Sequence, residues 1–354
     1  MPPRGSGWVK KPDYKSIRKK LIKSKCIDDN TGFTILNLRS KDIFISKSDN
    51  TIVIIFQDFK QIFHVDKIFS LKKLSLTRNL DHKLELLSQL GCLTDLNLSD
   101  NNKLTSIPSE IGKLTKLTDL NLSNNNKLTN IPSEIGKLTN LIHLSLYSNK
   151  LTNIPSEIGK LTNLTHLYLS NNKLILIPRE IGNLTSLTHL YLYNNKLTNL
   201  PSEIGNLTNL AGLSLYNNKL KNIPSEIGNL TNLTGLYLNN NQLTNIPSEI
   251  GNLTNFTYLY LYDNQLTNLP SEIGNLTNLI RLSLSYNELT ILPSEIGNLA
   301  NITQLSLNNN QLTNLPSEIG NLTNLTNLYL YCNKLTNEFK IQIKQLLKNC
   351  IILV

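Results

Sequence analysis

Cysteine is scarce in this chain. Its 354 residues include four, Cys26, Cys92, Cys332 and Cys350, and none belongs to a Cys-x-x-Cys pair. Because they lie far apart without disulfide or zinc-ligand spacing, we expect them to be reduced. The sequence also has no apolar run long enough to span a membrane, and the opening residues MPPRGSGWVKK contain no signal-peptide core. We therefore expect no membrane span and no secretory signal, and we predict a cytoplasmic location.

Motifs of enzyme chemistry are also missing. The sequence contains no glycine-rich phosphate loop, no His-Glu-x-x-His and no nucleophile elbow. Most Gly-Asn-Leu-Thr and Pro-Ser-Glu stretches recur at a fixed period, so they report on architecture rather than on a catalytic site. We expect no enzymatic activity, no cofactor and no metal.

What the chain has in abundance is one repeated unit. Residues 141–163 read LIHLSLYSNKLTNIPSEIGKLTN. Two copies that are one residue longer begin at Leu93 and Leu117, and a more divergent copy is expected to begin at Leu71. Later copies open at Leu164, Leu187, Leu210, Leu233, Phe256, Leu279, Ile302 and Leu325. A fixed period of this length is typical of a solenoid, in which no unit buries its own apolar face but a stack does.

The residues of one unit predict the path of one coil. Counting Leu141 as position 1, Leu144 and Leu146 alternate with polar residues, as in a short strand with one buried face. Asn149 ends that strand, and its amide is suited to satisfy backbone groups of its own turn and of the next coil. Pro155 begins a return leg that cannot be a strand interior, and Gly159 is expected to permit a turn with positive φ. Twelve stacked strands would line about 55 Å of concave wall.

The motif L-x-x-L-x-L-x-x-N-x-L followed by I-P-x-x-I-G resembles the leucine-rich repeat family over about three quarters of the chain. The resemblance implies an α/β repeat solenoid: a leucine-rich repeat horseshoe with a parallel β-sheet on the concave face and an irregular or 3-10 convex face. The stretch L-T-N-I-P-S-E-I-G-x-L-T-N-L is similar to intracellular Ras-group repeats. That similarity implies protein binding through the concave wall, with a Ras-like small GTPase or another signalling protein as the partner.

The repeats divide the chain into four parts. Residues 1–25 form a basic arm, 26–70 an N-terminal cap or degenerate repeats with a buried strand at 51–56, and 71–336 an array of about 12 units. Residues 337–354 are expected to form a capping helix, with Phe339, Ile343, Leu346 and Leu347 on one face. Residues 1–92 carry 18 Lys and Arg against 9 Asp and Glu, whereas the rest carries 17 against 16. The arm either solubilises the terminus or contacts an anionic partner.

Function is expected where the units differ. Of 13 tyrosines, all but Tyr14 fall at positions 3, 5, 7 and 8, which point off the concave wall. Tyrosine among serine and asparagine is typical of protein-recognition surfaces. The candidate partner-binding residues are Tyr147, His166, Tyr168, His189, Tyr191, Tyr193, Tyr216, Tyr237, Tyr258, Tyr260, Tyr262, Arg281 and Tyr286. The alternative is that tyrosine is a good strand residue, copied by duplication, and only stacks across strands.

Two further rows are predicted. His143, His166 and His189 occupy position 3 of successive units, so they should lie about 5 Å apart, too parallel to converge on a metal but suited to pH-sensitive binding. A glutamate recurs at position 17 on the convex side, and Lys113, Lys137 and Lys160 are placed to relieve the repulsion within its first members.

The predicted function is a non-enzymatic scaffold or adaptor in signalling, monomeric, that binds a partner protein through the tyrosine-rich concave face. We do not expect the repeats to bind nucleic acid. The alternative is an adaptor whose basic N-terminal region binds nucleic acid or a membrane surface while the repeats select a second protein.

Overall fold

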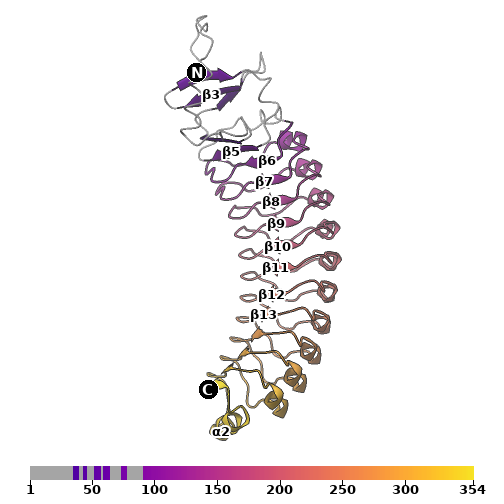
Figure 1. Cartoon of the computed structure of the whole chain (residues 1–354), viewed down its shortest axis with the longest axis vertical. Coiled ribbons are helices and arrows are strands. Elements are labelled where there is room, and N and C mark those ends of the chain that lie inside the picture. The colour runs from indigo at the N-terminus through magenta and orange to yellow at the C-terminus, as the bar shows by residue number, and fades with distance from the viewer. Residues whose placement is uncertain (1–34, 40–42, 46–51, 57–58, 64–72, 78–90) are drawn as a thin grey trace, which may run out of the picture.

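The computed structural model describes residues 35–39, 43–45, 52–56, 59–63, 73–77 and 91–354. In this part of the chain the repeats stack into a curved solenoid (Figure 1). The basic arm predicted for residues 1–25 lies outside the described residues.

One face of the solenoid is a parallel β-sheet of 14 strands in the order β1, then β5 to β17. Strands β6 to β16 are each three residues long and occupy positions 3 to 5 of their units, as expected from the alternating leucines. The strands of this sheet are β1 (Ile35–Arg39), β5 (Lys73–Thr77), β6 (Asp95–Asn97), β7 (Asp119–Asn121), β8 (His143–Ser145), β9 (His166–Tyr168), β10 (His189–Tyr191), β11 (Gly212–Ser214), β12 (Gly235–Tyr237), β13 (Tyr258–Tyr260), β14 (Arg281–Ser283), β15 (Gln304–Ser306), β16 (Asn327–Tyr329) and β17 (Ile351–Leu353). A separate antiparallel sheet contains β2 (Ile43–Ile45), β3 (Ile52–Phe56) and β4 (Phe59–Phe63).

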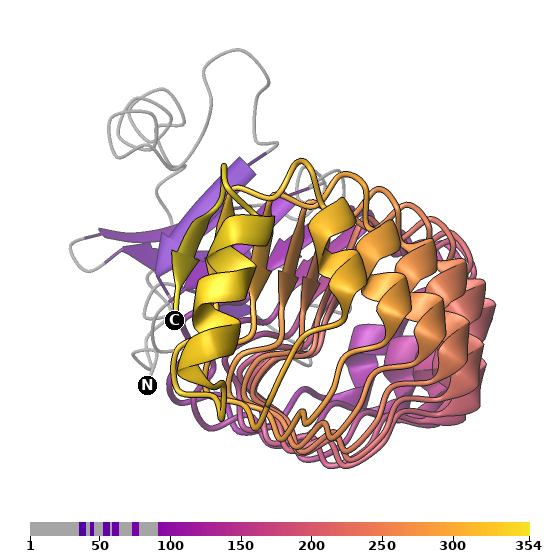
Figure 2. The same cartoon turned by 90° about the horizontal axis from the view of Figure 1, so that it is seen from below.

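The opposite face carries a column of short 3-10 helices, one per coil (Figure 2). Each follows the repeated proline, whose extended conformation precedes the first helical residue. The helices are η4 (Ser109–Lys113), η5 (Ser133–Lys137), η6 (Ser156–Lys160), η7 (Arg179–Asn183), η8 (Ser202–Asn206), η9 (Ser225–Asn229), η10 (Ser248–Asn252), η11 (Ser271–Asn275), η12 (Ser294–Asn298) and η13 (Ser317–Asn321). A strand on one side and a tighter 3-10 turn on the other confirm the predicted leucine-rich repeat solenoid.

The core is a continuous column of leucine and isoleucine between these two faces. Leu141, Leu144, Leu146 and Leu151 of one coil are fully buried, and the equivalent residues of other coils extend the same column. Phe256 replaces the first leucine of its unit and is also fully buried. Since every coil buries its leucines against its neighbours, the stack rather than the single unit is the stable element.

The repeated asparagine at position 9 ties neighbouring coils together. Asn195 Nδ2 donates to the carbonyls of Leu192 in its own turn and Leu169 in the preceding coil, at 3.0 Å each. Asn195 Oδ1 accepts from the backbone N–H of Leu174, also at 3.0 Å. The buried ladder is therefore confirmed, except that each asparagine reaches the preceding coil and not the next one.

The repeated glycine has a different role from the one predicted. The expectation of positive φ at Gly159 is wrong: a Cβ there would lie 2.4 Å from the carbonyl oxygen of Glu180 in the next coil. The glycine is required because consecutive 3-10 helices pack closely. Positive φ occurs instead at position 8, for example 56° at Asn171 and Asn194.

At the N-terminal end, β1 and β5 add two longer strands to the main sheet. Strand β1 pairs with β5 in parallel, with Leu36 opposite Leu74 and Leu38 opposite Leu76. The prediction of a strand at 51–56 agrees with β3, but its predicted burial lies outside the described features. Residues 26–34 also lie outside the described part.

The C-terminal end combines a helix and one more strand. Helix α2 (Asn337–Leu346) is capped by the preceding Thr336, whose hydroxyl accepts from the N–H of Phe339 at 3.2 Å. Ile343 is buried and Leu346 lies over Gly320, although half of it remains exposed. The prediction of a helix through residue 354 is wrong beyond α2, because β17 then pairs with β16 and extends the sheet. Among the described helices, none is long and apolar enough to cross a membrane.

Candidate functional site

The parallel register of the strands brings equivalent side chains of successive coils into rows. His143 pairs with His166, and His166 with His189, while Tyr168 lies opposite Tyr191. We call the surface formed by positions 3, 5, 7 and 8 of the coils between residues 93 and 336 the concave wall. Its rows run along the solenoid axis, and the buried leucines of the same strands lie behind them.

The three histidines form a continuous row of rings, in which His166 and His189 are stacked and His143 is tilted by 56° against His166. The ring centroids of His143 and His166 lie 4.9 Å apart, and those of His166 and His189 lie 4.7 Å apart, which confirms the predicted spacing. At one end, Asp119 Oδ1 lies 2.6 Å from His143 Nδ1. Burial, followed by the charges of His189 and His143, lowers the pKa of His166 below its usual value. No group of three or more metal-binding side chains is present among the described residues.

Six of the twelve tyrosines of the concave wall stack in three pairs across adjacent coils, as the alternative interpretation expected. The ring centroids of Tyr168 and Tyr191 lie 5.2 Å apart and those of Tyr193 and Tyr216 lie 4.6 Å apart, with interplanar angles of 8° and 6°. A third pair, Tyr237 and Tyr260, has a centroid distance of 5.3 Å. Stacking covers ring faces and leaves edges and hydroxyls for a partner.

The tyrosine hydroxyls are free to act in recognition. Among the described residues, none of these hydroxyls makes a hydrogen bond within the chain. Burial, followed by the charge of Tyr168, raises the pKa of Tyr191. Burial also raises the pKa of Tyr216, with Tyr193 as the next contribution. Since the hydroxyls of Tyr191 and Tyr216 stay protonated at neutral pH, each is both a hydrogen-bond donor and an acceptor.

A second aromatic cluster lies farther along the wall. The rings of Tyr258 and Tyr260 are stacked with centroids 6.4 Å apart, and the Arg281 guanidinium carbon lies 6.0 Å from the centroid of Tyr258. Tyr286 is 57% exposed and has φ of 56°, where other units place mainly asparagine, aspartate or serine. A bulky residue in the left-handed region costs about 1 kcal/mol or more. Tyr262 lies two residues after Tyr260 on the same coil and is half-buried.

Two glycines shape the middle of the wall, and we did not single them out as functional residues from the sequence. A Cβ on Gly212 would lie 2.9 Å from Cδ2 of His189, so the His189 ring lies over the glycine. At Gly235 the nearest atoms to a Cβ are Tyr258 O at 3.4 Å and Tyr237 Cε2 at 3.9 Å. Two successive glycines at a position that otherwise carries a side chain were the signal available in the sequence.

The asparagines at position 8 have a backbone role in addition to any role in recognition. Asn194, Asn217 and Asn240 all have positive φ, which asparagine tolerates better than most residues. Asn194 Nδ2 donates to Asn171 Oδ1 at 2.6 Å, and Asn217 Nδ2 donates to Asn194 Oδ1 at 2.7 Å. Part of their hydrogen-bonding capacity is therefore used within the wall.

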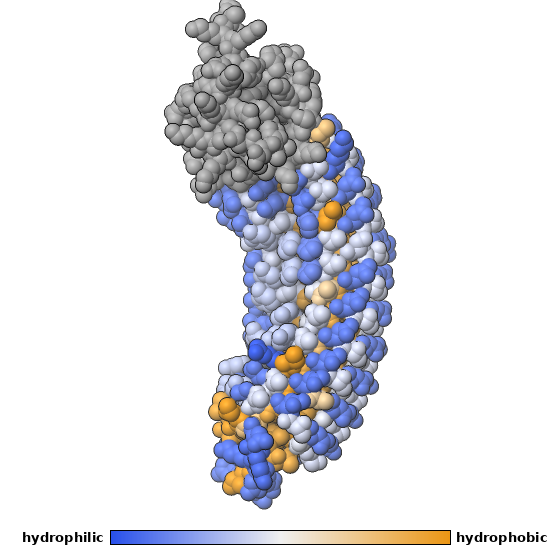
Figure 3. Space-filling model, in the orientation of Figure 1, coloured by the Kyte–Doolittle hydropathy of each residue, from blue (hydrophilic) through white to orange (hydrophobic). Residues whose placement is uncertain are grey.

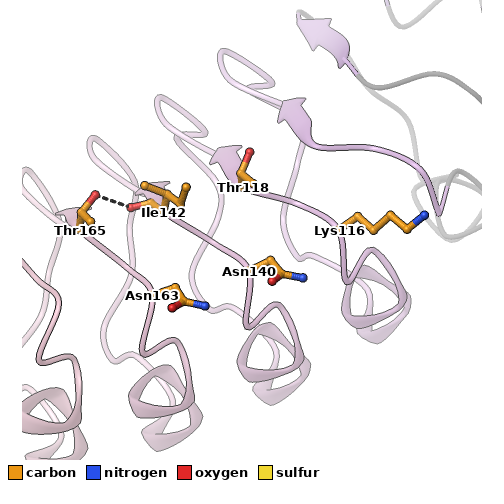
Figure 4. Close-up of a pocket in the computed structure, with 6 residues that line it drawn as sticks. All are labelled: Lys116, Thr118, Asn140, Ile142, Asn163 and Thr165. Atoms are coloured by element: carbon orange, nitrogen blue, oxygen red, sulfur yellow. Dashed lines mark hydrogen bonds between the residues drawn. The ribbon is translucent and has the colours of Figure 1, made fainter.

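A shallow pocket of about 510 Å³ lies on one flank of the solenoid, where coils meet (Figure 4). Its polar side chains are largely used by the solenoid: Asn140 Nδ2 donates to Thr115 O at 2.7 Å, and Thr165 Oγ1 donates to Ile142 O at 3.1 Å. Lys116 also lines it. This flank offers a ligand fewer free groups than the concave wall does.

The convex glutamates are not neutralised by the lysines that were expected to relieve them. Within the described residues, Lys113, Lys137 and Lys160 form no ion pair with a glutamate. Most of these carboxylates instead accept a long contact from the preceding serine, for instance Ser202 Oγ to Glu203 at 3.2 Å. Glu180 is the exception, because it follows Arg179 and accepts from its Nε at 3.3 Å.

A comparison of the chain with models of known protein families agrees with this repeat geometry. The family described as "Leucine-rich repeat region" matches residues 39–175, 120–196, 176–259 and 245–349. The chain belongs to the leucine-rich repeat family. Members of this family generally bind other proteins and typically act as non-enzymatic interaction domains.

Several solved leucine-rich repeat structures are similar to the chain. The Leptospira interrogans protein LIC12759 is 35% identical with a TM-score of 0.58, over 97% of this chain and 100% of that one. An internalin, InlF, from Listeria monocytogenes is 29% identical with a TM-score of 0.65, over 83% of both chains. Among curated proteins, no sequence matches.

A plant neighbour is larger than this chain. The ectodomain of the Arabidopsis thaliana receptor kinase GASSHO1/SCHENGEN3, solved in complex with CASPARIAN STRIP INTEGRITY FACTOR 2, is 33% identical with a TM-score of 0.64. The match covers 80% of this leucine-rich repeat chain but only 38% of the ectodomain.

Proposed function

We propose that this leucine-rich repeat protein is a non-enzymatic scaffold that binds a partner protein through the concave wall. The observation that carries the proposal is the array of stacked tyrosine rings whose hydroxyls make no hydrogen bond within the described chain. Such rings offer a partner both apolar edges and polar groups.

The stacking also favours tight binding. A tyrosine that must be ordered on binding loses side-chain entropy, about 0.5–1.5 kcal/mol for each immobilised side chain. The pair Tyr193 and Tyr216 is already ordered, because their rings lie 4.6 Å apart and nearly parallel. The backbone that leads to Tyr193 is anchored by the fully buried Leu190 and Leu192. The wall therefore acts as a preorganised surface.

Two clusters form the centre of the proposed interface. The first contains His166, His189, Tyr168, Tyr191, Tyr193 and Tyr216. The second contains Tyr237, Tyr258, Tyr260, Tyr262, Arg281 and Tyr286. Tyrosine and arginine are enriched at binding hot spots, and strained backbone is enriched at functional sites. Tyr286 combines high exposure with positive φ, so we place it within the second cluster.

The identity of the partner is a further part of the proposal. The similarity of L-T-N-I-P-S-E-I-G to Ras-group repeats favours a signalling protein such as a Ras-like small GTPase, bound in the cytoplasm by a monomeric scaffold. The plant ectodomain, which was solved in complex with CASPARIAN STRIP INTEGRITY FACTOR 2, supports ligand binding by a related array.

The test is capture of binding proteins from host cytosol with wild type and with the double variant Tyr191→Ala/Tyr260→Ala. Each truncation should weaken binding by about 2 kcal/mol if the residue is a hot spot. The double variant Tyr329→Ala/Tyr331→Ala, in the last coil, removes the same side chains away from the centre and should retain the partner. Equal capture by all three proteins would disprove the proposed site.

A further inference from the structure

One edge of the concave wall carries a column of six lysines. Each directly precedes the buried leucine at position 11 of its coil or the equivalent leucine of the longer coils. The column consists of Lys103, Lys127, Lys150, Lys173, Lys196 and Lys219, and all six side chains are exposed. We call it the lysine column.

The backbone holds the column in register. The N–H of Lys173 donates to Leu151 O at 2.8 Å, and the N–H of Lys196 donates to Leu174 O at 2.9 Å, each in the preceding coil. Because parallel strands lie about 4.8 Å apart, six members span about 24 Å. The lysine column is therefore a linear array of positive charge at fixed spacing.

These charges have no partner within the described chain. The ion pairs among the described residues are His143 with Asp119 and Arg179 with Glu180, and neither involves the lysine column. At the equivalent place farther along, Lys334 Nζ donates to Gln311 Oε1 of the adjacent coil at 3.0 Å. A lysine beside another lysine has no such acceptor, so neighbouring amines in the column repel each other.

The fold does not require lysine at this place. Later coils carry Gln242, Gln265, Glu288 and Gln311 there, and their buried leucines are equally inaccessible to solvent. The loss of these lysines follows the distribution of charge along the repeats. Residues 93–232 carry 12 Lys and Arg against 9 Asp and Glu, whereas residues 233–336 carry 2 Lys and Arg against 6 Asp and Glu.

The lysine column borders the first aromatic cluster. Lys196 and Lys219 each lie three residues after a tyrosine of the stacked pair Tyr193 and Tyr216. A ligand on these coils would therefore meet positive charge along one edge and tyrosine hydroxyls beside it.

We propose that the lysine column and the adjacent tyrosines bind an extended acidic segment of the partner protein, which lies along the N-terminal half of the solenoid. This inference rests on the proposed function, and it adds the chemistry and the orientation of the partner.

Two features favour an acidic peptide over single-stranded nucleic acid. Nucleic acid binds such sites by stacking bases on open aromatic faces. Here the faces of Tyr168 and Tyr191 cover each other, at 5.2 Å, and the same holds for Tyr193 and Tyr216. Peptide groups instead match the free hydroxyls, and carboxylates on one side of an extended chain recur about every 6.6 Å, within reach of flexible lysines.

The experiment measures fluorescence anisotropy of a labelled peptide of about ten glutamates, which spans roughly 33 Å when extended and so covers the column. The variant Lys150→Gln/Lys173→Gln/Lys196→Gln introduces the residue that later coils carry. The matched control Lys113→Asn/Lys137→Asn/Lys160→Asn removes the same charge from the convex side, where later coils carry asparagine. Thermal melting of both variants checks that the solenoid is intact.

We expect the column variant to bind the peptide about tenfold more weakly and the convex control to change affinity less than about twofold. Wild-type binding should also weaken steeply with salt, and less steeply in the column variant. Equal losses in both variants would show that only net charge matters, and no binding at low salt would overturn the proposal outright.

A labelled oligothymidine distinguishes the other polyanion. If it binds more tightly than the peptide and depends on the same lysines, the column is a nucleic-acid site and the acidic-peptide assignment is wrong. Should the peptide fail while a partner still depends on Tyr191 and Tyr260, the proposed function stands and this inference alone falls.

Discussion

Replacing Asn195 by alanine should destabilise the solenoid at its middle. Asn195 makes three hydrogen bonds of 3.0 Å, with Leu169 O, Leu192 O and the N–H of Leu174. The two carbonyls keep other partners, because Leu169 O also accepts from Asn172 and Leu192 O from Asn218. The N–H of Leu174, by contrast, has no second acceptor among the described residues.

The expected cost follows from that difference. A buried N–H left without an acceptor costs about 1–3 kcal/mol, and the two shared bonds add about 0.5–1 kcal/mol each. We therefore expect Asn195→Ala to lose about 2–5 kcal/mol in the free energy of unfolding, measured by guanidinium denaturation followed by circular dichroism. Hydrogen exchange of the Leu174 amide should accelerate as well.

Two comparisons make the result decisive. Asn199 is exposed and accepts only a 3.4 Å contact from Thr198, so Asn199→Ala should cost less than about 0.5 kcal/mol. Asn195→Asp keeps the acceptor for Leu174 but brings a charge against Leu169 O and Leu192 O, and should destabilise at least as much as alanine. If the two alanine variants unfold at the same denaturant concentration, the asparagine ladder does not hold the coils together.

Three further predictions follow from close contacts and titration. Gly205→Ala should cost about 1–3 kcal/mol of stability, because the new Cβ would lie 2.5 Å from Glu226 O. Gly235→Ala should be nearly neutral in the same denaturation assay, because the nearest atom to its Cβ would be 3.4 Å away. Equal losses of stability in the two variants would contradict the packing argument. Because the pKa of His166 is lowered in the folded state, stability should fall as the pH drops through the unfolded value near 6.5, and His166→Gln should flatten the melting temperature between about pH 5 and 8. Tyr286→Asn should relieve the strain of positive φ and raise stability by about 0.5–1 kcal/mol while weakening partner binding, and unchanged affinity would remove Tyr286 from the interface.

The repeat made the architecture predictable. Leu144 and Leu146 alternate with polar residues, Asn149 follows, and Pro155 prevents the strand from continuing. The path of each coil could therefore be predicted from local sequence alone. The histidine spacing followed from the same register, since equal positions in successive coils lie one strand apart.

The errors share one physical cause. The closeness of Gly159 to Glu180 O depends on the distance between two neighbouring coils, and the sequence of a single repeat does not predict that distance. Strand β17 is a second example. It pairs with β16 at the edge of the sheet, and the apolar C-terminal sequence alone does not predict that pairing.

The path of the coil, its buried leucines and the positions that face the concave wall all follow from the period of apolar residues, so they could be predicted without the structure. The organisation of the wall depends instead on contacts between coils: His189 lies over Gly212, Tyr193 stacks on Tyr216, and the lysine column has no acceptor in the described part of the chain. Those features arise between residues about one coil apart, where side chains of neighbouring units meet or fail to meet.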